Sequence, residues 1–193
     1  MKKIITILCA GMIIFSASAQ SNSVTAGAGF LNTKVRVQFE HGFSDMHSAG
    51  ANLGLYFQLN TGQRLEGFYR IYVGGDNERG MFIQASGGAG QFSYFLDEVD
   101  QISYTGFNKY NEGDKFITFG GGIAFGGKIT TGGGFVFEST LGGQLWTPPH
   151  SNFTEEFTEA YPVEALEEAA NVALFYLGPG FPLMFQMKFG FNF

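Results

Sequence analysis

The chain has 193 residues, of which 23 are Phe, 8 are Tyr and 29 are Gly, and its formal net charge at pH 7 is −6. The negative charge argues against nucleic acid as a partner, and the lack of any run of about eighteen apolar residues after residue 19 excludes a membrane-spanning helix from that part of the sequence. Aromatic residues and glycine in this proportion favour a closed β-sheet with a lipid-facing surface and a crowded interior.

The chain opens with the pattern of an export signal. Two lysines near the start precede an apolar stretch over residues 4–15, and a small-residue cleavage site ends at Ala19. We therefore predict a cleaved signal peptide over residues 1–19 and a single mature domain over 20–193. The one cysteine, Cys9, lies in the apolar stretch, so we expect no disulfide in the mature domain.

Segments of alternating polarity, separated by turn signals, follow along the mature domain. We predict strands over residues 23–31, 34–43, 49–59, 64–73, 80–94, 115–126, 133–146 and 180–193. The last strand alternates most clearly, because its odd positions up to Phe193 are all apolar and its even positions include Gln186 and Lys188. In the fifth strand, a bulge is predicted where Phe92 and Tyr94 change parity.

The charged residues within these strands fall on the face opposite the apolar one. A Lys or Arg on a lipid-facing surface near the bilayer midplane would cost about 2–4 kcal/mol, so this pattern is the one that a bilayer requires. We predict that the interior of a barrel collects these residues into a buried ionic network. Its predicted members are Lys34, Arg36, Glu40, Arg64, Glu66, Arg70, Glu138 and Lys188.

The predicted connections are short at one end of the barrel, whereas the other end carries two long loops over residues 95–114 and 147–178. This asymmetry is typical of outer-membrane barrels. Both loops are rich in Asp and Glu, which predicts either an ordinary solvated surface or a site for divalent cations that bridge to lipopolysaccharide phosphates or to a surface ligand. Apolar residues at helical spacing over 163–175 predict a short helix that caps the barrel mouth.

Four segments carry a resemblance to one protein family. They are VRVQFEHGFSDMHSAGANLGLYF at 35–57, RLEGFYRIYV at 64–73, GGGIAFGGKITTGGGFVFESTLGGQL at 120–145 and MKFGFNF at 187–193. They resemble the small eight-stranded outer-membrane β-barrel proteins of Gram-negative bacteria, in particular the barrel-only members without an assigned activity. The resemblance implies an all-β, eight-stranded antiparallel up-and-down transmembrane β-barrel. It also implies that the barrel-assembly machinery reads Phe189, Phe191 and Phe193 as its signal, and it supplies no catalytic residue or cofactor.

Catalytic and metal chemistry find little support in the sequence. His41 and His47 have Ser44 and Ser48 nearby, and His150 is followed by Ser151 in the second long loop, but proximity in sequence does not define a catalytic triad. Three scattered histidines without a mature cysteine give no metal-ligand spacing, and the glycine clusters match no phosphate-binding motif. The sequence therefore predicts no enzyme, no cofactor and no metal site.

We predict an integral outer-membrane protein of structural or surface-interaction type, with a side-chain-filled lumen and outer-membrane lipid, lipopolysaccharide and the barrel-assembly machinery as partners. Two alternatives stay open. One is a lipid-modifying barrel enzyme with His150 as its base, and the other is a soluble periplasmic lipocalin-like binder whose apolar faces turn inward.

Overall fold

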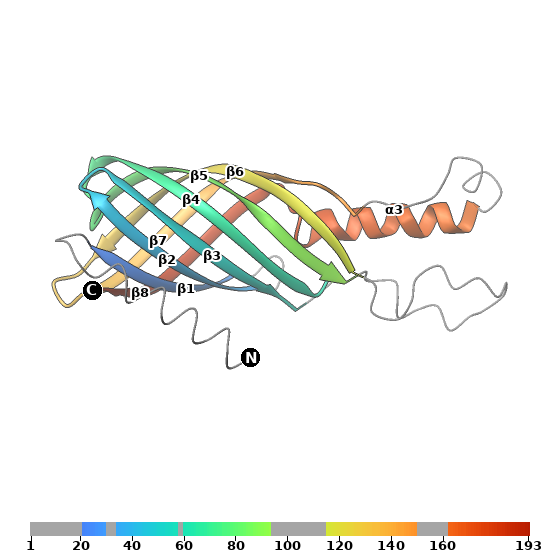
Figure 1. Ribbon diagram of the computed structural model, residues 1–193, viewed down its shortest axis with the longest axis horizontal. Coiled ribbons are helices and arrows are strands. Elements are labelled where there is room, and N and C mark those ends of the chain that lie inside the picture. Colours follow the sequence, from blue (N-terminus) through green and yellow to red (C-terminus); the bar gives the residue numbers. More distant parts are fainter. Residues whose placement is uncertain (1–20, 30–33, 58–59, 94–114, 150–161) are drawn as a thin grey trace.

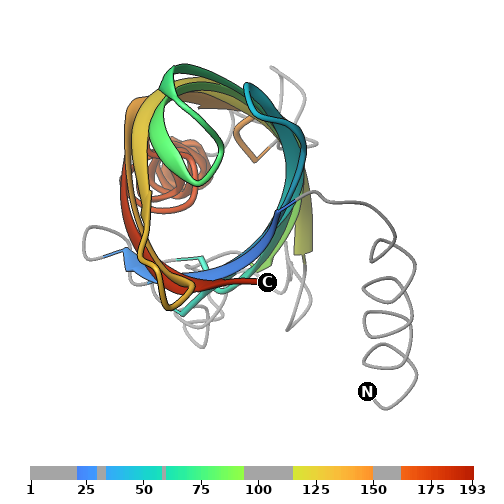
Figure 2. The same ribbon diagram turned by 90° about the vertical axis from the view of Figure 1, so that its left-hand side faces the viewer.

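The computed structural model describes residues 21–29, 34–57, 60–93, 115–149 and 162–193, and these form a closed β-barrel (Figure 1). Its strands are β1 (Asn22–Gly29), β2 (Lys34–Ser44), β3 (His47–Tyr56), β4 (Gly62–Gly75), β5 (Arg79–Ser93), β6 (Lys115–Thr130), β7 (Phe135–Trp146) and β8 (Leu183–Asn192). Each strand pairs antiparallel with its sequence neighbours, and β1 pairs with β8 to close the ring seen end-on in Figure 2. The predicted all-β, eight-stranded antiparallel up-and-down barrel is therefore confirmed.

The two ends of the barrel differ, and we name them the turn end and the loop end. At the turn end, only short connections join β2 to β3, β4 to β5 and β6 to β7, and the C-terminus lies at this end (Figure 1). The β6–β7 turn follows Thr130, which lies beyond the predicted strand end at residue 126, and it closes at Gly134. The φ of 80° at Gly134 is a backbone conformation that glycine adopts without steric strain.

Register irregularities occur near the turn end and not at the loop end of β5, where Phe92 lies. The bulge predicted near Phe92 is not observed in the described part of β5, which pairs with β6 without a register shift, and Phe92 is fully buried in the interior. Phe92 keeps the regular alternation of β5, because its ring packs in the barrel interior and not on the outer wall. Shifts are found instead between Gly42 and Ser44 and between Tyr72 and Gly74. Tyr94 lies outside the described residues.

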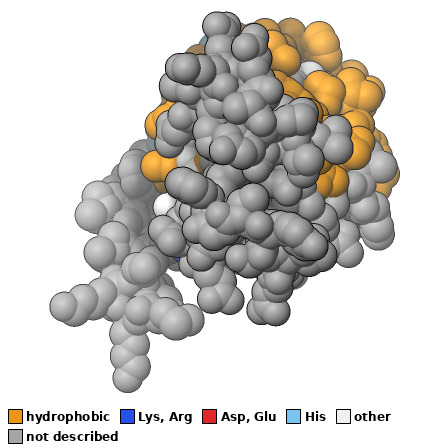
Figure 3. All heavy atoms as spheres, turned by 90° about the vertical axis from the view of Figure 1, so that its right-hand side faces the viewer, with side chains coloured by type: hydrophobic (Ala, Val, Ile, Leu, Met, Phe, Trp, Pro, Cys, Tyr) orange, Lys and Arg blue, Asp and Glu red, His pale blue; other side chains and the backbone are white. Residues whose placement is uncertain are grey.

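Side chains alternate between the interior and the outer wall, and the outer wall is apolar. On β6, Ile117, Phe119, Ile123 and Phe125 are 60–63% exposed, whereas Ala124 between them is fully buried. The same alternation runs along β2, β4, β7 and β8. Where described atoms are visible in Figure 3, hydrophobic side chains gather on the barrel wall.

The helix α3 (Pro162–Leu177) lies between β7 and β8 at the loop end and continues along the long direction of the barrel (Figure 1). It covers the predicted helix over 163–175 and begins at a proline, a residue favoured in the first helical turn. No helix in the described part of the chain is long and apolar enough to cross a membrane. The long loop 95–114 and residues 150–161 of the second loop lie outside the described residues, so the predicted cation site in them does too.

Candidate functional site

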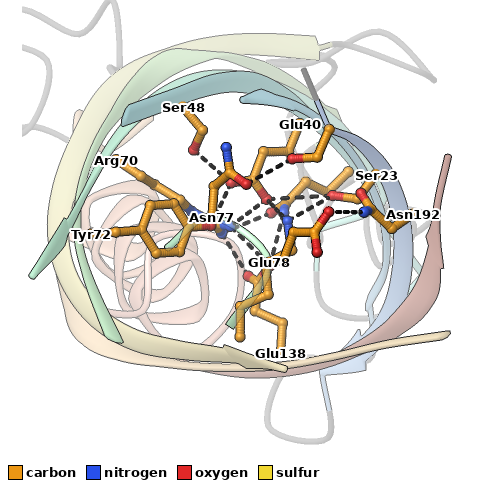
Figure 4. Close-up of polar contacts among 12 residues, drawn as sticks. Ser23, Glu40, Ser48, Arg70, Tyr72, Asn77, Glu78, Glu138 and Asn192 are labelled. Carbon is orange, nitrogen blue, oxygen red and sulfur yellow. Dashed lines mark hydrogen bonds and ion pairs between the residues drawn. The ribbon is translucent and has the colours of Figure 1, made fainter. Parts of the chain in front are cut away.

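The barrel interior is the candidate site, and its most connected part is a group that we call the central cluster: Glu40, Arg70, Lys128, Glu138 and Lys188. All five side chains are at most 2% exposed. Figure 4 shows Glu40, Arg70 and Glu138 pointing toward one another across the interior from different strands. The cluster ties β2, β4, β6, β7 and β8 together through the middle of the barrel.

Arg70 is the centre of this cluster. Its Nη1 lies 2.8 Å from Oε2 of Glu40, and its Nη2 lies 2.6 Å from Oε1 of Glu138. Its Nε donates to Oε1 of Gln84, the residue directly opposite it on β5, at 2.9 Å. The guanidinium also lies 4.1 Å from the ring centroid of Phe82, a cation–π contact. Arg70 is thus held by charge, hydrogen bonding and ring stacking at once.

Each carboxylate of the central cluster pairs with Arg70 and with one lysine. Lys128 Nζ lies 3.1 Å from Glu40, and Lys188 Nζ lies 2.6 Å from Glu138, its direct neighbour in the β7–β8 register. Lys128 lies opposite Glu138 in the register but reaches across the barrel to Glu40 instead. Because these charges are buried, removal of a single partner leaves an uncompensated ion, which typically costs about 3–5 kcal/mol.

Glu40 is saturated by donors. Ser48 Oγ and the Tyr72 hydroxyl donate to its Oε1 at 2.5 and 2.7 Å, in addition to the bonds from Arg70 and Lys128 to Oε2. A carboxylate with this many charged and neutral donors is held in its ionised form and is poorly suited to take up a proton from a substrate. The central cluster is therefore an ion-pair network in which both oxygens of the Glu40 carboxylate already accept hydrogen bonds.

A second group, the loop-end cluster, consists of Lys34, Arg36, Arg64 and Glu66. Arg36 and Arg64 share the single carboxylate of Glu66 at 2.8 and 2.6 Å. The Lys34 ammonium lies 5.5 Å from the centroid of the Tyr56 ring, and no carboxylate of the described residues lies within ion-pair distance of it. Among these residues, three basic side chains thus lie around one carboxylate.

An aromatic cluster of Tyr56, Phe92, Phe116, Trp146 and Phe175 closes the interior beyond the loop-end cluster. Phe175 comes from the last turn of α3 and is fully buried, with its ring 5.7 Å from that of Phe116 and 6.4 Å from that of Phe92, both edge-on. Edge-to-face contacts at these distances are favourable. The helix predicted to cap the barrel mouth does so through this residue.

The chain that follows α3 is fixed to the interior by two side chains. Arg64 Nη1 donates to the Pro179 carbonyl at 2.8 Å, and Gln144 Nε2 donates to the Phe181 carbonyl at 2.7 Å. Gly180 leaves room for the Phe175 ring, since a Cβ at this position would lie 2.2 Å from a ring carbon. The segment that follows α3 is therefore held across the barrel mouth by side chains of β4 and β7.

The opposite opening is partly covered by the β4–β5 turn, which lies across the ring in Figure 2. Asn77 in this turn accepts a hydrogen bond from Ser21 Oγ at 2.8 Å and donates to the Ser44 carbonyl at 2.9 Å. Gly42 beside it has no room for a Cβ, which would lie 2.1 Å from the Asn77 amide nitrogen. Side chains and turns thus obstruct the interior at both ends.

The structure buries all eight residues of the predicted ionic network inside the barrel, and it joins all of them except Lys34 in ion pairs. Sequence reasoning missed Lys128, because the sixth strand was predicted to end before it. Alternation in fact continues through Phe125, Gly127 and Ile129, and this signal places Lys128 on the interior face. The alternation of the second strand places Gln38 on the same face as Arg36 and Glu40, but the predicted network left out its amide, which bridges Glu138 and Lys188.

The neighbours His47 and Ser48 near the turn end contact different partners on opposite sides of the barrel wall. His47 Nδ1 lies 2.9 Å from the Tyr69 hydroxyl on the outside of the barrel, and its ring stacks on Phe43. Ser48, the next residue, points inward and donates to Glu40, because successive residues of a strand face opposite sides. His41 Nδ1 lies 2.8 Å from Asn22 Oδ1. His150 and Ser151 lie outside the described residues.

The residues of the predicted assembly signal lie on the outer wall near the turn end. Phe189, Phe191 and Phe193 are 51%, 62% and 66% exposed. The ring of Phe189 lies 5.2 Å from that of Phe137 on β7, and the ring of Phe191 lies 5.9 Å from that of Phe135. Within the part of the chain that the structure covers, no group of three or more His, Cys, Asp or Glu side chains is arranged to hold a metal ion.

The fold and interior define a closed eight-stranded β-barrel with an apolar outer wall and an ion-paired, aromatic-sealed interior. A scan of the chain against protein-family models gave no match, and searches of curated proteins and of solved structures also gave none.

Proposed function

We propose that the protein is an integral outer-membrane protein of structural or surface-interaction type, whose barrel spans the membrane and presents its long loops to the outside. The observation that carries this proposal is the distribution of polarity in the barrel. Leu65, Leu141 and Leu145 are 60–78% exposed on the outer wall, whereas Arg70 and Glu138 are fully buried. In water this arrangement would be strongly unfavourable on both faces, but a bilayer favours it.

Closure of the sheet supports the same proposal. In hydrocarbon every backbone N–H and C=O needs an internal partner, and a closed barrel supplies one because it has no free edge strand. A soluble lipocalin-like binder would require its apolar side chains to face an interior cavity, and the interior here is filled with ion pairs instead. The polarity therefore favours the membrane protein over the soluble binder.

Aromatic residues at the turn end fit the proposed membrane boundary. Phe43, His47 and Tyr69 contact one another on the outer wall, with ring centroids 5.9–6.2 Å apart. Amphipathic rings of this kind gather where a membrane meets water. In the proposed orientation the turn end faces the periplasm and the loop end faces the cell exterior, where lipopolysaccharide and a surface ligand are the proposed partners.

The interior supports a scaffold function and not transport or catalysis. The central cluster, the loop-end cluster and the aromatic cluster occupy successive levels of the barrel, and Phe175 closes the mouth. A barrel of eight strands has an interior just wide enough for its own side chains. No serine–histidine pair was found among the described residues that could carry out lipid acyl transfer. The proposed role therefore belongs to the outer wall and the loops.

Membrane fractionation of cells that express the full chain tests the proposal. We expect the protein in the outer-membrane fraction, resistant to alkaline and urea washes and released only by detergent. We also expect faster migration on a gel without heating than after heating, since a closed barrel resists unfolding by detergent. Recovery in the soluble periplasmic fraction, with migration that heating does not change, would refute the membrane location. To test the enzyme alternative, His150→Ala is assayed for altered lipid A acylation, and an effect there would contradict a non-enzymatic role.

A further inference from the structure

A groove of about 330 Å³ lies on the outer wall near the turn end. It crosses Met81, Gly127 and Ser139, which are paired neighbours on β5, β6 and β7. Met81 is 64% exposed, so the groove opens on the outer face of the barrel. Ile129 and Phe137 line the side of the groove that lies toward the turn end. Small-molecule pockets begin at volumes of about 300 Å³, so the groove has room for part of a ligand.

Gly127 leaves open space in the groove where a side chain would stand. Nothing lies within 4 Å of the position that a Cβ would occupy there, whereas a Cβ on the preceding Gly126 would lie 2.3 Å from a ring carbon of Phe82. Packing therefore requires a glycine at 126 but not at 127. The φ of Gly127 is not positive, and β6 pairs with both neighbouring strands without a register shift. A strand glycine that serves neither a bend nor a bulge often marks the close approach of a ligand.

Arg79 supplies a positive charge at the end of the groove nearest the turn end. It is exposed and pairs in register with Ile129 on the outer wall. None of the ion pairs among the described residues includes Arg79. The carboxylates of the same turn have other partners, since Asp76 accepts from the backbone N–H groups of residues 78 and 79, and Glu78 accepts from Asn192 (Figure 4). A guanidinium of this kind binds phosphate through two parallel hydrogen bonds.

We propose that the groove binds one diacyl phospholipid of the membrane leaflet at the turn end, with its phosphate at Arg79 and the first part of an acyl chain in the hollow over Gly127. The hydroxyl of Ser139, one residue pair further from the turn end, donates to an ester carbonyl of the lipid. Phosphate, ester and chain then follow one another from the turn end toward the middle of the wall, as they do in a leaflet. This inference rests on the proposed function, because it requires an outer wall that faces lipid.

Lipid retention by the folded protein in an uncharged detergent tests the site. Phosphatidylglycerol is added to the delipidated barrel, and native mass spectrometry counts the lipid molecules that stay bound. The unmodified chain is expected to retain one. Retention of none, or a broad distribution of lipid numbers as for non-specific contact, would overturn the proposal.

Two glycine variants locate the lipid. Gly127→Leu fills the hollow with a side chain for which the wall has room, and it should weaken lipid binding by about tenfold. Gly67→Leu is the matched control, because Gly67 is an exposed outer-wall residue of β4 that does not line the groove and also has room for a Cβ. It should leave the affinity unchanged. If the two variants behave alike, the lipid binds elsewhere on the wall and the proposed site is wrong.

Two charge variants test the phosphate contact. Arg79→Gln should weaken the binding of phosphatidylglycerol by about fivefold, whereas Lys115→Gln, at an exposed residue of the loop end, should not change it. Diacylglycerol, which lacks the phosphate, should bind to the unmodified chain and to Arg79→Gln equally well. Equal losses for the two charge variants would contradict a phosphate at Arg79.

A measurement on the unmodified chain guards against variants that fail to fold. Phosphatidylglycerol with a photoreactive diazirine near the start of its acyl chain should label the peptides that contain Met81 or Phe137. Even labelling of the outer wall would overturn the proposal. The two proposals fail separately: a protein of the outer membrane that retains no lipid loses only this site, whereas a soluble protein already fails the fractionation test.

Discussion

Glu138 offers the sharpest test of the ion-paired interior. Its carboxylate is fully buried and accepts hydrogen bonds from Arg70 Nη2 at 2.6 Å, Lys188 Nζ at 2.6 Å and Gln38 Nε2 at 3.1 Å. The substitution Glu138→Gln keeps the shape of the side chain but removes its charge. It also places an amide N–H₂ group, which can only donate, beside residues that themselves donate.

The expected loss in the free energy of unfolding follows from the charges of the central cluster. In the unmodified chain three cations of this cluster, Arg70, Lys128 and Lys188, face the two carboxylates of Glu40 and Glu138. Glu138→Gln leaves the three cations facing one carboxylate, and we expect a loss of about 3–5 kcal/mol in the free energy of unfolding, as for other broken buried ion pairs.

Lys188→Met removes a positive charge from the same cluster, whereas Glu138→Gln removes a negative one. It leaves Arg70 and Lys128 facing Glu40 and Glu138, so the cluster becomes balanced, and we expect a smaller loss than for Glu138→Gln. In the double variant the excess charge equals that of the unmodified chain. The double variant should therefore be less destabilised than the sum of the two single variants, with a coupling of about 1–3 kcal/mol.

Urea unfolding in detergent micelles measures these differences. The chain has one tryptophan, Trp146, which is only 4% exposed in the aromatic cluster, so its fluorescence reports on the closed barrel. Glu78→Gln, at an exposed turn residue, is the matched control and should change the free energy of unfolding by less than about 0.5 kcal/mol. If Glu138→Gln costs no more than this control, or if the two substitutions prove additive, the ion-paired interior has been misjudged.

Three further predictions concern other parts of the molecule. Leu141→Arg, midway along β7 on the outer wall, should lower the free energy of unfolding in lipid vesicles by about 2–4 kcal/mol, and Phe135→Arg near the turn end by about 0–1 kcal/mol; equal losses would contradict the proposed bilayer position. Phe175→Ala should weaken the binding of the segment that closes the mouth to the barrel by about 3–5 kcal/mol. The expected signs are a red shift of tryptophan emission and faster proteolysis after α3. Tyr176→Ala, at the more exposed neighbour, should leave both measurements unchanged. Phe193→Ser should reduce the amount of assembled barrel in cells while the free energy of unfolding of refolded protein changes by less than about 0.5 kcal/mol; normal assembly would remove Phe193 from the proposed signal.

The period-2 pattern was sufficient to predict the strands and the facing of their charged residues. In β4, for example, Arg64, Glu66 and Arg70 occupy even positions between apolar odd ones, and all three are buried in the structure. Such alternation is a local property, because each side chain faces the side opposite to its neighbour wherever the strand lies. Strand existence and facing could therefore be obtained from sequence without any knowledge of tertiary contacts.

The partners of these residues could not be obtained in the same way. Lys128 lies opposite Glu138 in the strand register but pairs with Glu40 across the barrel, a contact that exists only after the sheet closes. The aromatic cluster was missed for a related reason, since Phe92 and Phe116 are apolar residues that suit either face of a strand. Whether such a ring faces lipid or the interior depends on whether it lies on the same face of the sheet as the charged residues of the neighbouring strands.

The ionic interior is better explained as a determinant of strand register than as a source of stability. Buried ion pairs recover little more than the cost of their desolvation. A slip of β4 by one residue, however, would turn Arg64 and Arg70 to the outer wall, where each would cost about 2–4 kcal/mol in a bilayer, and would bring Leu65 into a polar interior. Outer-wall residues favour one register less strongly, because the exchange of one lipid-facing apolar side chain for another changes the free energy of folding only slightly. We infer that the central and loop-end clusters select one register among the closed barrels that this sequence could form.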